Sequence, residues 1–188
     1  IYMRAKELRV TADVPRGAFL LRSLKKGESV PTDIIQAQFP DRQNDFVLSI
    51  GEGDVVLIRQ MPEGSGIKEL NKIATSVEES LRSGGESTVV VGIGTIATHL
   101  RDLAKSYKEA QIAIEVGKVF DTEKYIINYE NLGIGRLIYQ LPTVMCEMFL
   151  QEVFKKNPID ALDQETLFTI NKFFENNLNV SETARKLF

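Results

Sequence analysis

The sequence predicts an α+β fold, in which a mostly antiparallel sheet with helices packed on it is followed by a purely helical segment. Two β-rich runs, 45–50 and 55–58, flank the glycine-rich turn Gly51-Glu52-Gly53-Asp54, a pattern typical of a hairpin. Up to Tyr129, runs of apolar residues at helical spacing alternate with short strands. Beyond that residue only helical patterns occur.

The elements follow in order along the chain. Strands are expected at 17–24, 45–50, 55–58, 87–93 and 125–129. Helices are expected at 1–10, 32–39, 66–82, 100–116, 132–139, 142–155 and 163–177. The strand at 87–93 is nearly all apolar, which predicts burial on both faces. Thr32 or Asp33 is expected to cap the second helix.

The last 26 residues predict a helix-turn-helix arrangement. Asp163 is the expected N-cap of the first helix, 177–179 is a break, and Ser181 is the expected N-cap of the second helix. Ala184 and Leu187 form a narrow apolar edge, and the small Ala184 is expected to let the two helices cross closely.

Composition restricts the class of protein. The chain has 188 residues, of which 43% are hydrophobic, as is usual for a globular protein. Its net charge of −3 indicates that it does not bind nucleic acid through charge alone. A single cysteine, Cys146, suits a reducing cytoplasm, and no run is apolar enough to span a membrane. The absent initiator Met and the incomplete helix pair at the end suggest a chain trimmed at both ends.

The C-terminal stretch 179–188, reading NVSETARKLF, resembles the start of the DNA-binding domain of bacterial carbohydrate diacid and purine catabolism regulators. The hairpin with Gly51-Glu52-Gly53-Asp54 resembles the GGDEF-like domain of the same regulators, a degenerate relative of nucleotide cyclases. Further likeness to the diacid branch comes from three stretches, which are 4–8, 39–42, and 91–94 together with 103–110.

This resemblance implies a transcription activator of sugar diacid utilisation, located in the cytoplasm. It implies a GGDEF-like domain at 1–141, entered by a helix at 1–10, then a helical linker at 142–160 and a truncated DNA-binding domain at 161–188. The sugar diacid effector would bind an absent N-terminal domain, and a recognition helix beyond Phe188 would read DNA. The present region would be a relay and a homodimer surface, through the helix at 100–116 or the one at 142–155.

The same resemblance implies contacts to the DNA backbone in the full-length protein. The expected contact residues are Asn179, Ser181, Thr183 and Arg185, because the first helix of such a motif crosses the phosphates. Ser181 can equally be a plain N-cap. The tail after Pro142 has five basic and seven acidic residues, so by itself it is not expected to hold DNA.

The main alternative to a regulator is an active diguanylate cyclase, and the types of residue at its key positions argue against it. Phosphoryl transfer needs carboxylates that hold Mg²⁺, one on the first strand and another in the hairpin. Glu52-Gly53-Asp54-Val55-Val56 keeps Gly53 and Asp54 of the signature, but Val55 occupies its acidic fourth position. The first strand has no acid and carries Arg22 instead. We therefore expect no enzyme activity, metal or cofactor, and a role for Asp54 as a turn residue.

A dinucleotide-binding motif is rejected, and a ligand-binding function remains open. Gly92-Ile93-Gly94-Thr95-Ile96-Ala97 matches a dinucleotide fingerprint by spelling, but no second strand follows at the required distance, so these glycines are expected to permit close helix packing. His99 is alone and is expected to be solvated or capping. The second functional hypothesis is a small-ligand or nucleotide-binding domain without turnover.

Overall fold

The computed structural model describes residues 2–8, 10–25, 27–51, 53–85, 88–120, 125–154, 162–176 and 179–187. The chain divides into two compact units, Ile1–Gln140 and Leu141–Phe188. The expected functional domains at 1–141, 142–160 and 161–188 stay a prediction, and the expected boundary at 157–160 lies outside the described residues.

A five-stranded sheet in the order β2-β3-β1-β4-β5 forms the first unit. Its strands are β1 (Arg16–Ser23), β2 (Asp45–Ile50), β3 (Asp54–Gln60), β4 (Val89–Ile93) and β5 (Ile126–Asn128). All neighbouring strands are antiparallel except the parallel pair β4–β5. The predicted hairpin and the mostly antiparallel sheet are therefore confirmed. All five residues of β4 are buried, as its continuous apolar run predicted.

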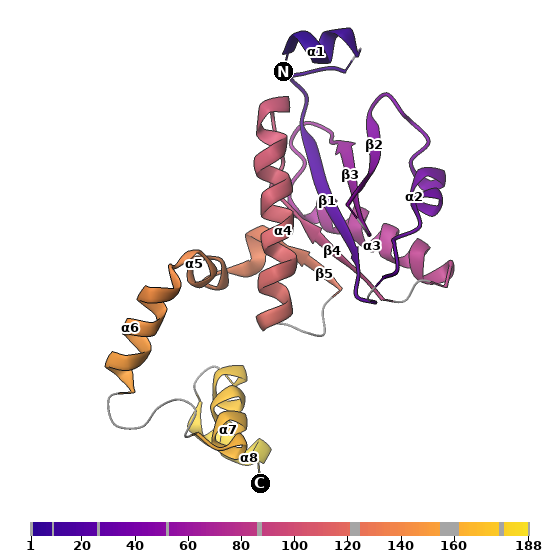
Figure 1. Cartoon of the computed structure of the whole chain (residues 1–188). Helices are drawn as coiled ribbons and strands as arrows, with labels where there is room; N and C mark the ends of the chain where they lie inside the picture. Colours follow the sequence, from indigo (N-terminus) through magenta and orange to yellow (C-terminus); the bar gives the residue numbers. More distant parts are fainter. Residues whose placement is uncertain are drawn as a thin grey trace. The chain divides into compact units, whose positions relative to one another are not determined.

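Helices cover both faces of this sheet (Figure 1). They are α2 (Thr32–Gln38), α3 (Ile67–Ser83) and α4 (Leu103–Phe120), the last preceded by a 3-10 turn at Leu100–Asp102. On one face, Phe19 and Leu57 form a core with Ile35 of α2 and Leu70 of α3. On the other, strand residues such as Leu20 pack against α4. Successive residues of a strand point to opposite faces, so β1 supplies both cores.

The remaining elements are helices and a 3-10 turn. They are α1 (Tyr2–Glu7), a 3-10 turn at Tyr129–Leu132, α5 (Gly135–Gln140), α6 (Thr143–Val153), α7 (Gln164–Glu175) and α8 (Val180–Leu187). The single helix expected at 132–139 is thus divided, because Gly133 adopts a φ of +54° between the 3-10 turn and α5.

Three expectations about helix ends and faces are wrong. Pro31, not Thr32 or Asp33, is at the N-cap of α2 and makes no side-chain cap bond. Ser181 lies inside α8, whose cap is Asn179, because the Asn179 Oδ1 accepts a bond from the Glu182 N–H at 3.0 Å. Ala184 is exposed, and α8 instead buries Thr183.

Candidate functional site

An ion cluster of three side chains lies where β1 ends and β3 begins. Arg22 donates from Nε to Asp54 Oδ1 at 2.9 Å and from Nη2 to Asp54 Oδ2 at 2.7 Å. Its Nη1 donates to Glu115 Oε1 at 3.0 Å. The guanidinium therefore lies between two carboxylates and holds the first in a two-bond fork, the strongest geometry for such a pair.

The sheet register places this cluster. Arg22 and Asp54 are direct partners in the β1–β3 ladder, so their side chains leave the same face of the sheet. That face is covered by α4, which carries Glu115. The Arg22 and Asp54 side chains are only 24% and 20% exposed. The hydrogen bond to Asp54 raises the pKa of Arg22 above its ordinary value although burial opposes it, so the guanidinium stays charged.

In the part of the hairpin that the structure describes, the signature residues do not gather into an acidic cluster. Val55, at the acidic position of the signature, is buried in the core on the opposite face of the sheet, and Val56 is buried toward α4. The expectation that Asp54 is a turn residue is wrong. Asp54 is the first residue of β3, and its carboxylate is bound by Arg22. Gly53 accepts a bond from Val30 N–H at 3.4 Å, and Glu52 lies outside the described residues.

A cavity of about 470 Å³ lies beside the cluster. Its lining includes Arg22, Lys25, Asp54, Tyr107 and Gln111. The Gln111 Nε2 donates to the Tyr107 hydroxyl at 3.1 Å, so α4 contributes an ordered polar wall. Cationic and hydrogen-bonding groups around an open cavity are suited to a polar ligand.

The glycines of the dinucleotide-like motif are packing positions. A Cβ on Gly92 would lie 2.2 Å from the Ala110 carbonyl oxygen of α4, and one on Gly94 would lie 1.9 Å from that of Ser106. Ser106 Oγ also donates to the Thr95 carbonyl at 2.6 Å. The two glycines therefore permit the close packing of α4 on the sheet that was expected from the sequence.

Helices α7 and α8 of the second unit are joined by polar contacts to Asn176, which follows α7. Lys186 Nζ donates to Asn176 Oδ1 at 2.6 Å, and Asn179 N–H donates to the Asn176 carbonyl at 3.0 Å. The Thr183 hydroxyl is buried and donates to the Asn179 carbonyl at 2.7 Å. Of the four predicted DNA-contact residues, Asn179, Ser181 and Arg185 are exposed, whereas Thr183 is engaged inside the helix pair.

Replacement of Asn179 by alanine is expected to loosen α8 without affecting the sheet. The change removes the side-chain acceptor for the Glu182 N–H, and loss of such a cap costs about 1 kcal/mol. Amide hydrogen exchange should therefore accelerate at Glu182 and Thr183. Asn179→Asp keeps an acceptor oxygen and is the matched control. Equal protection of these amides in Asn179→Ala and in the native chain would contradict the assigned cap.

Asp163 is predicted to make the start of α7 sensitive to acid. Its Oδ1 accepts a bond from the Thr166 N–H at 2.6 Å, confirming the expected N-cap. This bond lowers the pKa of Asp163. A lowered acid pKa contributes stability above the ordinary pKa that is lost as the pH falls through the folded-state pKa. NMR of the Thr166 amide should show this loss, and Asp163→Asn, which keeps an acceptor but does not titrate, should remove the transition.

Sequence reasoning missed Glu115, which completes the ion cluster. Glu115 lies on α4, 61 residues after Asp54, and only the docking of α4 on the sheet brings it to Arg22. The pairing of Arg22 with Asp54 has a weak signal in the sequence, because the two opposite charges lie near the ends of two expected strands. His99 is half exposed beside Thr98 and Asp102, as a solvated residue should be.

Comparison with known proteins gives the family. The model of the GGDEF-like domain matches residues 1–116, which contain Arg22, Asp54 and Glu115. The chain belongs to the GGDEF-like domain family. This confirms the resemblance to regulators that carry such a domain. No part of the chain covered by the structure forms a helix capable of crossing a membrane.

Two known proteins show similarity to this GGDEF-like protein. A purine catabolism regulatory protein of Bacillus subtilis (strain 168) is 29% identical over 105 residues. The match covers 54% of this chain and 19% of that protein, so the chain spans about a fifth of its relative. The crystal structure of a regulator of polyketide synthase expression from Bifidobacterium adolescentis aligns with 99% of this chain and 70% of its own, at 11% identity and a TM-score of 0.48.

Proposed function

We propose that the chain is part of a bacterial transcription regulator in which the GGDEF-like domain is a relay without enzyme activity. The observation that carries this proposal is the Arg22 cluster, since a cation stands on the first strand where a metal-binding acid would be needed, and its guanidinium engages the hairpin carboxylate of Asp54. The similarity to a purine catabolism regulatory protein supports the regulatory class. In the cytoplasm the regulator would activate sugar diacid utilisation, with the diacid bound by a domain N-terminal to Tyr2.

The pair α7–α8 is proposed as the supporting part of a helix-turn-helix. This proposal is supported by apolar side chains of α7 and α8 that are exposed to solvent. A recognition helix following α8 would cover them. Leu167, Phe168 and Ile170 of α7 are 40%, 53% and 37% exposed, and Val180 of α8 is 71% exposed. The exposed Asn179, Ser181 and Arg185 would then contact phosphates, and Thr183 would hold the helix in place.

The proposed homodimer is supported by α6 more than by α4. The apolar residues Ala110, Ala113 and Ile114 of α4 are fully buried against the sheet and are not available. By contrast, Val144, Met145, Met148, Phe149 and Val153 of α6 are all more than half exposed. A helix that is apolar on most sides is normally covered, and pairing with its twin would place two DNA-binding units at a fixed spacing.

DNA binding by the intact reading frame tests the regulator proposal. Mobility-shift assays on the protein extended beyond Phe188 should select specific genomic fragments. Arg185→Ala should weaken binding to all sequences several-fold and reduce the salt slope by about 1, as expected for one lost phosphate contact. Lys108→Ala, an exposed cation on α4, is the matched control. Specific binding that is unchanged by Arg185→Ala would remove α8 from the DNA interface.

A small-ligand domain without turnover is the second candidate, favoured by the cavity beside Arg22 and Lys25. Thermal unfolding with nucleotides and with sugar diacids separates the two functions. Stabilisation by a nucleotide alone, lost in Lys25→Ala, would favour the ligand-binding domain. No shift with any nucleotide is the result expected of a relay.

A further inference from the structure

We propose that the GGDEF-like domain pairs with a second copy of itself through the edge strand β2, forming one continuous sheet across two chains. The proposal extends the regulator function, which calls for a dimer but does not name a contact in the sheet domain. It rests on three features of β2: free backbone groups, an uncharged exposed side, and a sequence that is complementary to itself.

Among the residues that the structure describes, β2 is paired with another strand on one side only. The strand is at the end of the order β2-β3-β1-β4-β5, and Gln60 N–H donates to the Asn44 carbonyl at 3.1 Å. Asn44 and Gln60 are therefore a hydrogen-bonded pair. Because hydrogen-bonded and non-bonded pairs alternate in an antiparallel ladder, the backbone N–H and C=O groups of Phe46, Leu48 and Ile50 also point toward β3. Those of Val47 and Ser49 point away from the sheet. Asp45, the third outward residue, already donates its N–H to the Asp41 carbonyl at 2.7 Å.

Beyond Asp45, whose carboxylate is paired with Arg59 at 3.0 Å, this edge lacks the features that normally keep edge strands apart. From Phe46 to Gly51 the sequence is FVLSIG, with no charge and no proline. Lysines, prolines and inward-pointing charges are the usual protection against pairing of free edges. Leu48 and Ile50 are instead 50% and 39% exposed. An apolar, unprotected edge of this kind is expected to be covered in the working protein.

The strand is complementary to its own reverse. In an antiparallel two-fold pair centred on Leu48, each Leu48 lies opposite its twin and each Phe46 lies opposite an Ile50, all on one face. On the other face, Val47 lies opposite Ser49. The outward backbone groups of these two residues then form the hydrogen-bonded pairs. The exposed apolar residues are therefore matched by apolar residues of the same strand, which makes a second copy of this chain the occupant.

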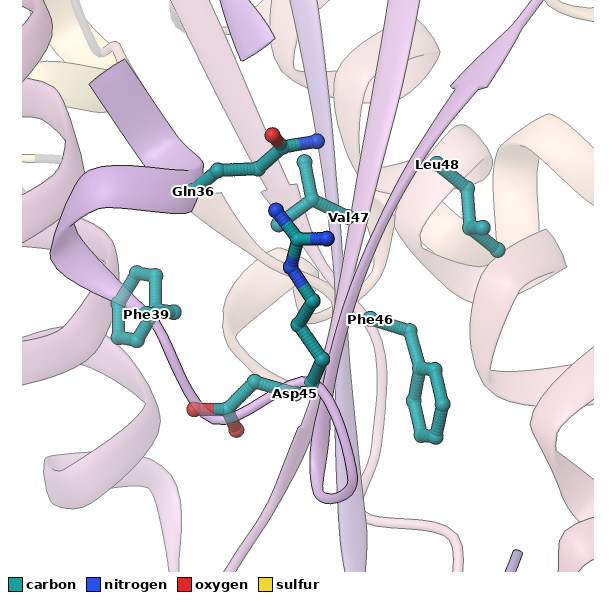
Figure 2. A pocket seen from close by; sticks show the side chains of 7 residues that line it. Gln36, Phe39, Asp45, Phe46, Val47 and Leu48 are labelled. Atoms are coloured by element: carbon teal, nitrogen blue, oxygen red, sulfur yellow. The ribbon is translucent and has the colours of Figure 1, made fainter. Parts of the chain in front are cut away.

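Space is available on both faces of the sheet beside β2. A cavity of about 280 Å³ adjoins the strand on the α2 side, where Gln36 and Phe39 face Val47 and Asp45 (Figure 2). On the other face, Phe46 and Leu48 are among the residues that line an apolar groove of about 540 Å³. Side chains of an incoming strand can therefore be accommodated without displacing a helix.

Site-specific cross-linking tests the two-fold pair. Leu48→Cys in a Cys146→Ser background should form a disulfide-linked dimer on mild oxidation. Directly opposed residues in a non-bonded pair have Cα atoms about 4.5 Å apart, within the range a disulfide allows. Ile50→Cys is the matched control, because it lies on the same face but roughly 13 Å from its twin, four residues along the strand. It should cross-link at least tenfold more slowly.

A proline variant provides the second arm. Ser49→Pro, added to the Leu48→Cys chain, removes only an outward N–H, so the hairpin should keep its thermal stability while the disulfide-linked dimer is lost. Ser49→Ala should leave cross-linking unchanged. Equal cross-linking of Leu48→Cys and Ile50→Cys, no cross-linking of either, or persistence in Ser49→Pro would overturn the β2 pair. If light scattering still shows a dimer in that case, the contact through α6 survives and the proposed function is not affected.

Discussion

Arg22→Ala is expected to destabilise the GGDEF-like domain and to make its stability depend on divalent cations. The variant leaves Asp54 and Glu115 close together without the guanidinium that separates them. Removing one member of a half-buried pair should lower the free energy of unfolding by about 1–3 kcal/mol. Because hard divalent cations bind carboxylate oxygens, millimolar Mg²⁺ or Ca²⁺ should restore part of this loss.

Chemical denaturation with and without divalent cations measures both effects. Arg22→Lys is the matched control, since it keeps the positive charge but loses the two-bond fork, and should be intermediate in stability and insensitive to cations. The native chain should also be insensitive. An Arg22→Ala variant as stable as the native chain would show that the cluster contributes nothing. Equal responses of all three to Mg²⁺ would show that Arg22 does not act as the counter-ion.

Gly94→Ala is expected to disrupt the docking of α4 more than any other single methyl group. The added Cβ would lie 1.9 Å from the Ser106 carbonyl oxygen, a backbone atom that can move only with the helix. Overpacking of this kind should cost about 3 kcal/mol or more. Because α4 also carries Glu115, the contact between Arg22 and Glu115 should be lost with it.

Gly66→Ala is the matched control for this prediction. Gly66 has an extended φ of −134°, and a Cβ there would meet only Glu69 Oε2 at 3.8 Å. Its cost should stay below about 1 kcal/mol. Thermal unfolding of both variants gives the comparison. A Gly94→Ala protein that unfolds within a few degrees of Gly66→Ala would mean that β4 and α4 are not in this tight contact.

Periodicity was sufficient to predict the strands and the hairpin of the sheet. Alternating apolar residues and the Gly51–Asp54 turn place the hairpin, and the continuous run through Val91 places a strand buried on both faces. Helix ends were predicted less well, since several polar residues at 179–182 compete for the same cap. Only the backbone geometry selects Asn179 over Ser181. Thr183, rather than Ala184, is buried because its hydroxyl is satisfied inside its own helix.

Of the candidate site, the sequence predicted only the absence of the acids that a metal ion would need. The types of residue at Arg22 and Val55 already argued against a metal site. Their arrangement could not be derived, because it depends on the β1–β3 register and on a helix that joins from far along the chain. The role of Asp54 was misassigned for the same reason. A turn residue and an ion-pair residue look identical until the opposing strand is placed.

We propose that the Arg22 guanidinium has replaced divalent-cation chemistry in this GGDEF-like domain. The most direct measurement is GTP turnover by the native chain with Mg²⁺ or Mn²⁺, with products separated by chromatography. We expect no product above a protein-free blank, because no divalent cation would be held at the hairpin. Cation-dependent product formation that disappears in Asp54→Asn would contradict it.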